Sequence, residues 1–166
     1  MENDKILYAI KDNICFIKMI GLIQCTTVSG FDLFIKQILQ DEAIKDILID
    51  LCETEHIDST NLGLIAEIAK FMIKKHNRKP TIISKYERIT AILENMGFKR
   101  IFIIVKGLED FANELKEIPG VDQSELEKAK MILEAHKAIM EVSDKNESIF
   151  KDVVKMFEEQ LNTPSE

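Results

Sequence analysis

The sequence predicts a mixed α/β fold in which a β-sheet is flanked by helices and followed by a C-terminal helical hairpin. Three observations predict it. Two β-rich runs near the start are separated by only three polar residues, apolar strands then alternate with amphipathic helices, and strand signals stop after Pro119-Gly120. The first feature indicates an antiparallel hairpin, and the alternation indicates mainly parallel strands with right-handed crossovers.

The first half of the predicted sheet is built from three strands and one helix. Residues 6–10 and 14–20 form the hairpin around the turn Lys11-Asp12-Asn13. Apolar residues then recur at three- and four-residue steps from Phe31 to Leu39, which predicts a helix capped by Thr26 or Thr27. Residues 44–51 are nearly all apolar, as expected for a central strand covered on both faces.

The second half repeats a helix–strand pattern. A helix is expected over residues 59–76, because its apolar residues form one broad arc on a helical wheel. A short strand over 81–84 follows, then a helix over 86–96 that Gly97 ends. A last buried strand is expected over 101–105 and a further helix over 108–115.

Beyond residue 118 the pattern is helical only, so we divide the chain into a domain over 1–118 and an extension over 119–166. Asp144 to Glu147 fits a capping box between two amphipathic helices. Their apolar stripes must be covered by the α/β domain, by a second copy in a homodimer, or by a partner. The stripes consist of Leu126, Ala129, Ile132, Leu133, His136, Ile139 and Met140, and of Ile149, Phe150, Val153, Val154, Phe157 and Leu161.

Composition excludes several classes of function. The 166 residues are 46% apolar and 31% charged, which suits a folded domain, and the net charge of −7 argues against a nucleic-acid partner. No apolar run reaches the ~20 residues of a membrane span, and no secretory leader is visible, so we expect a cytoplasmic protein without membrane insertion. The three cysteines and three histidines are scattered, which predicts neither a disulfide framework nor a metal site.

The stretch HIDSTNLG, residues 56–63, places an acid and two hydroxyls where an apolar strand becomes an apolar helix. Asp58 or Ser59 suits a plain helix N-cap. A catalytic Ser59 would need a base and an oxyanion hole, but the G-x-S-x-G pattern and the glycine-rich phosphate-binding patterns are absent, so we expect no enzyme.

Phosphorylation is the third interpretation. A phosphate on Ser59 would lie at the positive end of a helix dipole, which tolerates the charge. Glu53, Glu55 and Asp58 are near in sequence, so the phosphate would add to a negative surface and repel a partner that docks through apolar or acidic contacts.

These residues resemble the STAS domain of anti-sigma-factor antagonists. Asp58, Ser59, Thr60, Leu62 and Gly63 match the D-S-[ST]-x-L-G pattern that opens the family's second helix, and residues 85–98 are similar to its third helix and the following glycine. The resemblance covers about residues 5–117. Many members have glycine where this chain has Asn61, and an aspartate in a G-x-x-D pattern where it has Gln24.

The resemblance implies a STAS-like fold and a partner switch. Unphosphorylated, the chain would bind an anti-sigma factor with serine-kinase activity, and phosphorylation of Ser59, or alternatively Thr60, would release it. A metal-dependent serine phosphatase would reset the switch. ATP and magnesium would belong to these partners, so no cofactor is expected here.

Further residues are assigned to this expected site. Asp58, Asn61 and Gly63 would shape the switch loop and the helix cap. Leu64, Glu67 and Phe71, with Gln24, are candidates for the docking surface, although packing on a neighbouring helix or on the C-terminal hairpin explains such residues equally well. The alternative functions are a constitutive STAS scaffold subunit of a sensory or transport complex, and a small-molecule sensor with an apolar pocket.

Overall fold

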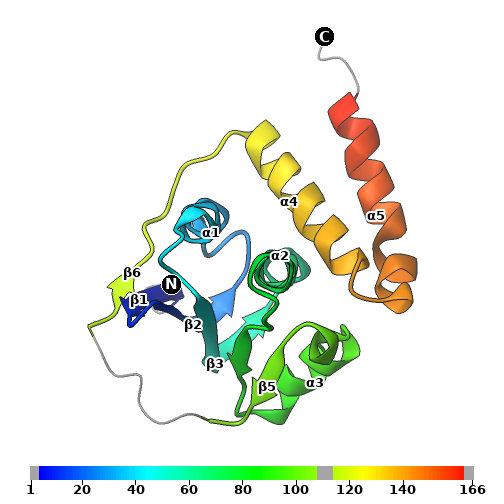
Figure 1. Cartoon of the computed structure of the whole chain (residues 1–166). Helices are drawn as coiled ribbons and strands as arrows, with labels where there is room; N and C mark the ends of the chain where they lie inside the picture. Colours follow the sequence, from blue (N-terminus) through cyan, green and yellow to red (C-terminus); the bar gives the residue numbers. More distant parts are fainter. Residues whose placement is uncertain (1–3, 108–113, 163–166) are drawn as a thin grey trace.

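The computed structural model describes residues 4–107 and 114–162 and has a six-stranded sheet in the order β5-β4-β3-β2-β1-β6 (Figure 1). The strands are β1 Lys5–Lys11, β2 Ile14–Ile23, β3 Asp46–Ile57, β4 Thr81–Ile83, β5 Ile103–Val105 and β6 Lys116–Glu117. The helices are α1 Phe31–Gln40, α2 Ser59–His76, α3 Glu87–Asn95, the single 3₁₀ turn η1 Phe98–Arg100, α4 Glu125–Met140 and α5 Asp144–Asn162.

The strand directions confirm the predicted fold class. β1 pairs antiparallel with β2 and with β6, whereas β2, β3, β4 and β5 pair in parallel. The hairpin turn contains Asp12 and Asn13 at φ 52° and 66°. Aspartate and asparagine tolerate this left-handed region better than other non-glycine residues, so the local sequence suits the tight turn.

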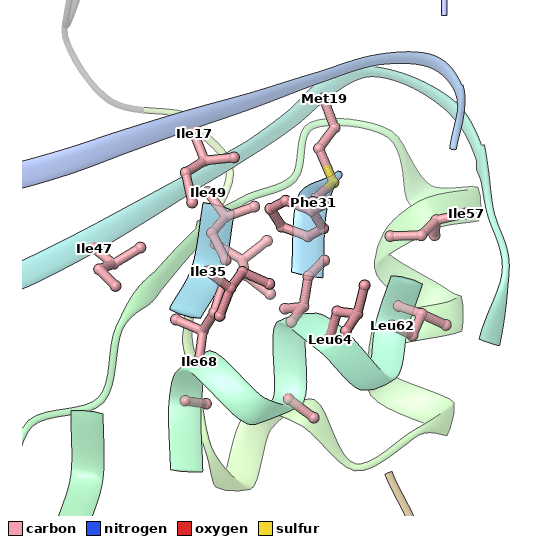
Figure 2. Packing of buried hydrophobic residues seen from close by; sticks show 14 of the residues in the cluster. Ile17, Met19, Phe31, Ile35, Ile47, Ile49, Ile57, Leu62, Leu64 and Ile68 are labelled. Carbon is pink, nitrogen blue, oxygen red and sulfur yellow. The ribbon is translucent and has the colours of Figure 1, made fainter. Parts of the chain in front are cut away.

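The molecule is layered from the sheet outward. α1 and α2 cover one face of the sheet, α4 packs on the outer side of α2, and α5 packs on α4 (Figure 1). The main core lies between the central strands and the first two helices. Figure 2 shows this core, with Ile17 and Met19 of β2, Ile47 and Ile49 of β3, Phe31 and Ile35 of α1, and Leu62, Leu64 and Ile68 of α2.

Three boundaries differ from the sequence prediction. α1 begins at Phe31 after the left-handed Gly30 (φ 84°), so the prediction of a threonine cap was wrong. The Thr27 hydroxyl instead serves the preceding turn, where it accepts from the backbone N–H of Gln24. β3 runs on to Ile57, because β2 extends to Ile23 and pairs with its distal end.

The end of the α/β region also differs. The strand expected over 101–105 begins only at Ile103, because the N–H groups of Ile101 and Phe102 donate to the Phe98 carbonyl and close the η1 turn. The helix expected over 108–115 lies mainly outside the described residues, and its last two, Glu114 and Leu115, are not helical. β6 was not predicted, since a two-residue strand leaves no periodic pattern.

The C-terminal hairpin is present as two helices joined by a short turn. The cap of α5 differs from the prediction, because the Ser143 hydroxyl, and not Asp144, accepts from the N–H of Asn146 at 3.1 Å. Of the helices within the described residues, none has both the length and the apolar character needed to cross a membrane.

Candidate functional site

Asp58 joins the end of β3 to the start of α2. It is the N-cap of α2, and its Oδ1 accepts from both the backbone N–H and the side-chain amide of Asn61, at 2.9 and 2.8 Å. Such a cap satisfies amide hydrogens that the first turn of a helix leaves without partners. Asn61, the residue that replaces the glycine of many STAS domains, is therefore a buried partner of the cap.

The same carboxylate also fixes the neighbouring β2–α1 loop. Its Oδ2 accepts from the N–H of Cys25 at 2.9 Å, and the N–H of Asp58 donates to the carbonyl of Ile23 at 3.0 Å. One side chain thus ties together the distal end of β2, the loop that follows it and the beginning of α2. The backbone that presents the two hydroxyls is rigidly held.

The two hydroxyls differ in their environment. Ser59 is the first residue of α2 and is half-buried, whereas Thr60 is only 6% exposed. The Ser59 Oγ lies 2.9 Å from Nε2 of His136, which belongs to α4. Position 59 is therefore the more accessible of the two hydroxyls, and the C-terminal extension contacts it directly.

His136 is held in one orientation. Its Nδ1 lies 2.7 Å from the carbonyl oxygen of Ile132, one turn earlier in α4, and its ring packs edge-on against Phe150 of α5 at 5.4 Å between centroids. Because a carbonyl can only accept, Nδ1 carries the proton, and in the neutral ring Nε2 then accepts from the Ser59 hydroxyl. The ring is 5% exposed.

The sequence places His136 on an apolar stripe but does not predict its contact with Ser59. The available signal was a polar side chain among six apolar ones, since a buried polar group needs a hydrogen-bond partner. Which residue would supply that partner depended on how α4 docks on the domain, and no local pattern encodes this docking.

A catalytic Ser59 would need a base within hydrogen-bond reach, and no such base was evident from the sequence. In the structure His136 is at that distance. The second nitrogen of His136 is bound by a backbone carbonyl of its own helix, not by a carboxylate. The adjoining cavity, lined by Thr60, Asn61 and Ile132 among others, has a volume of about 50 Å³. That volume suits a water molecule or two and is far below that of an ordinary substrate pocket.

Gly63 lies at the closest approach of α2 and α4. A Cβ atom on Gly63 would stand 2.1 Å from the carbonyl oxygen of Ala135, which is fully buried. Only glycine permits this backbone contact. Further along the pair, the Lys70 ammonium and the Glu141 carboxylate form an exposed ion pair.

The expected docking residues lie beside this helix pair. Leu64 is 3% exposed and belongs to the core cluster, while Phe71 is partly buried against that cluster and lies under the Lys75 ammonium at 5.5 Å. The backbone carbonyl of Gln24 accepts from the N–H groups of Thr27 and Val28 in the β2–α1 turn. In this structure Leu64 is covered by the chain itself.

Glu67 lines a cavity of about 430 Å³ between α1, α2 and α4. Burial raises the pKa of its carboxyl to about 7, and the nearby Glu134 of α4 adds to the increase. The other charged residues that line the cavity are Asp32, Lys36, Glu127 and Lys130. This lining differs from the apolar pocket expected of a small-molecule sensor. Over residues 4–107 and 114–162, no cluster of metal-ligating side chains is found.

Comparisons with known proteins agree with the fold. The STAS domain family profile matches residues 5–117, and no curated protein sequence matches the chain. Among solved structures, an anti-sigma factor antagonist from Mycobacterium paratuberculosis is 19% identical, with a TM-score of 0.52 over 63% of this chain and 87% of that one. A putative anti-sigma factor antagonist from Thermotoga maritima is 23% identical, with a TM-score of 0.51 over 61% and 86%.

A third similar structure is the Bacillus cell fate determinant SpoIIAA in its phosphorylated form. It is 13% identical, with a TM-score of 0.50 over 62% of this chain and 90% of that one. At these identities the likeness shows the fold. The family match ends at residue 117, before α4, the helix that contributes both His136 and Ala135.

Proposed function

Because the chain belongs to the STAS domain family, we propose that it is an anti-sigma-factor antagonist that works by phosphorylation-controlled partner switching. The observation that carries the proposal is Ser59 at the first position of α2, on backbone fixed by the Asp58 cap. A phosphate there would lie at the positive end of the helix dipole and would leave the fold intact.

The proposed partners follow from this site. An anti-sigma factor with serine-kinase activity would bind the unphosphorylated form and phosphorylate Ser59, and a metal-dependent serine phosphatase would reverse the modification. Glu53 and Glu55 are exposed near the start of α2, so the phosphate would extend an existing negative surface. Like charge across an interface weakens binding, and release therefore needs no large change in the fold.

Ser59 is the preferred acceptor over Thr60. The Ser59 side chain is half-buried and its hydroxyl contacts His136 of α4, whereas Thr60 is 6% exposed within α2 itself. The similar structure of SpoIIAA is of its phosphorylated form, which supports a switch of this kind.

Co-purification tests the switch. We expect Ser59→Ala to recover the kinase partner at least as well as the wild type, and Ser59→Asp to recover it at least about 10-fold less, since a carboxylate imitates part of the phosphate charge. Thr60→Val, which removes the other hydroxyl at similar volume, is the matched control and should keep both binding and phosphorylation. Equal recovery of the partner by the alanine and aspartate variants would contradict a phosphorylation switch at Ser59.

A constitutive STAS scaffold is the second candidate, and the Ser59–His136 hydrogen bond is the observation that favours it. In that case the hydroxyl only helps to hold α4 in place. Intact-mass measurement of the protein from its native host separates the two functions, because a scaffold shows no phosphorylated fraction under any growth condition.

A homodimer through the C-terminal helices is a further arrangement that the surface allows. Leu126 of α4 and Ile149 and Met156 of α5 are 54%, 49% and 57% exposed. A dimer that uses this side of the hairpin predicts twice the chain mass of 19.1 kDa in light scattering, and a fall in mass on Ile149→Lys combined with Met156→Lys. An unchanged monomer mass in both forms removes this arrangement.

A further inference from the structure

α4 occupies the side of α2 that carries Ser59. Three contacts spaced along α2 hold it there: the Ser59–His136 hydrogen bond, the Gly63–Ala135 backbone approach and the Lys70–Glu141 ion pair. The spacing of four and seven residues places all three on one face of α2. This face is therefore an interaction surface, and in this structure its occupant is the chain's own C-terminal helix.

The docked helix covers the Ser59 hydroxyl on the side that faces His136. Its hydrogen points to Nε2 of His136 at 2.9 Å, and Phe150 backs the imidazole from α5. Phosphorylation adds a phosphorus atom and three oxygens to Oγ, and a kinase must approach that oxygen in line with the transferred group. The buried His136 ring at hydrogen-bond distance occupies part of the space around this oxygen.

The contact at Gly63 makes docking depend on a small residue. The backbones of α2 and α4 approach this closely only because Gly63 has no Cβ, so the packed interface has no space for a larger side chain at this position. Buried apolar side chains of α4, among them Ala135, Ala138 and Ile139, hold the covering helix together with the Ser59–His136 hydrogen bond and one exposed ion pair. Because α4 lies on the outside of the domain, it can open at a lower free energy than the central strands.

We propose that α4 is an intramolecular cover of Ser59, and that docking of α4 and modification of Ser59 exclude one another. A protein that reaches Ser59 must bind the α2 face in place of α4. The part of this inference that concerns a kinase rests on the proposed function, whereas the covering of position 59 by α4 does not. The docking equilibrium of the extension then sets the fraction of molecules in which Ser59 can be phosphorylated.

Thiol labelling measures the cover without any kinase. In a full-length chain with Cys25→Ser and Cys52→Ser, Ser59→Cys places a thiol at the covered position, and iodoacetamide alkylates it at a rate that follows its exposure. Cys15 is fully buried and serves as the unreactive internal reference. Peptide mass spectrometry then reports the modification at position 59 against time.

Gly63→Ala opens the cover from the side of the domain. Alanine is a better helix former than glycine, so α2 keeps its own helical structure while the added Cβ meets the Ala135 carbonyl. We expect alkylation at position 59 to become at least about 10-fold faster as the docked population falls. Gly107→Ala is the matched control, because a Cβ there meets nothing within 4 Å, and it should leave the rate unchanged.

Glu141→Lys is a second variant that acts from the extension. Both members of its ion pair are more than half exposed, so the change does not threaten folding, and it sets two ammonium groups against each other. We expect a rise of about 2- to 3-fold in the alkylation rate. Rapid alkylation in the parent chain that neither variant increases would overturn the proposal. Failure of the phosphorylation switch would appear separately, in the comparison of Ser59→Ala with Ser59→Asp.

Discussion

At the scale of single residues, the junction between β3 and α2 is organised by carboxylates in opposite roles. Asp58 accepts three hydrogen bonds, from Asn61 and Cys25, and these bonds join the start of α2 to the β2–α1 loop. Glu67 lies two turns further along α2, beside Glu134, where burial disfavours the charge. One acid builds the site, and the other makes the neighbouring helix contact sensitive to pH.

Replacing Glu67 with glutamine should stabilise the protein at alkaline pH. In the folded protein its pKa rises from 4.5 to about 7, so the native state holds a proton that the unfolded state releases between these values. Stability due to this group is therefore present below pH 4.5 and is lost as the pH rises to 7. We expect Glu67→Gln to gain about 1 kcal/mol at pH 8, a figure reduced for partial solvent screening.

Urea denaturation at pH 5 and pH 8 measures this effect. Glu42→Gln, which removes the same charge from an exposed loop, is the control. The explanation fails if both variants change stability equally at pH 8, because the effect would then come from net charge alone. Five other charged residues line the cavity with Glu67: Asp32 and Lys36 of α1, and Glu127, Lys130 and Glu134 of α4. On α2 itself, Lys70 is also a charged neighbour of Glu67.

At the scale of elements, a buried amide helps to anchor the C-terminal hairpin to the domain. Asn146, near the start of α5, is fully buried, and its Nδ2 donates to the carbonyl of Met96 at 2.8 Å and to that of Ile139 at 3.0 Å. These carbonyls close the ends of α3 and α4. The amide therefore joins three elements that are separated in sequence, and it orients α5 so that Phe150 supports His136.

Loss of this amide should loosen the hairpin. We expect Asn146→Ala to cost about 1–3 kcal/mol in the free energy of unfolding, because the part-buried Met96 carbonyl and the buried Ile139 carbonyl both lose this donor. Asn146→Asp should cost more, since it faces two carbonyl oxygens with a carboxylate that cannot donate. Asn162→Ala, at an exposed position of the same helix, should stay within about 0.5 kcal/mol of wild type in the same urea titration. If Asn146→Ala lowered the free energy of unfolding as little as Asn162→Ala does, this role of Asn146 would be contradicted.

At the scale of the whole molecule, the layers differ in how they are held. The strands β2 and β3 pair over nearly their full length and contribute many of the fully buried side chains, whereas α4 meets the domain mainly along one side of α2. Regions with fewer buried apolar contacts open at lower free energy than the core. The proposed boundary between residues 118 and 119 then separates two units of unequal stability.

Native-state hydrogen exchange should show this order. We expect the amides of α5 to exchange first, those of α4 next, and those of β2 and β3 last, with rates differing by at least about 10-fold between α4 and the central strands. Mass spectrometry of peptic fragments measures it. Equal protection of α4 and the central strands would mean that the hairpin and the sheet open together, and would remove the boundary.

Local patterns determined most of the elements and the chemistry of the α2 start. Short β-rich and apolar runs identified the strands, and the 3.6-residue period identified the long helices, because a helix with one buried face imposes that period. The Asp-Ser-Thr triplet identified the cap, since hydroxyl and carboxylate oxygens satisfy first-turn amides. The start of α1, the two-residue β6 and the cap of α5 depend on neighbours distant in sequence, and these were missed or misplaced.

What HIDSTNLG by itself determined is a capped helix start that offers a hydroxyl, with a glycine one turn later. Only the tertiary structure decided that His136 accepts from this hydroxyl and that Gly63 receives the backbone of α4. The physical reason is that a cap is satisfied within four residues of chain. The surface that covers it is chosen by the shape and polarity of a helix more than 70 residues away in sequence.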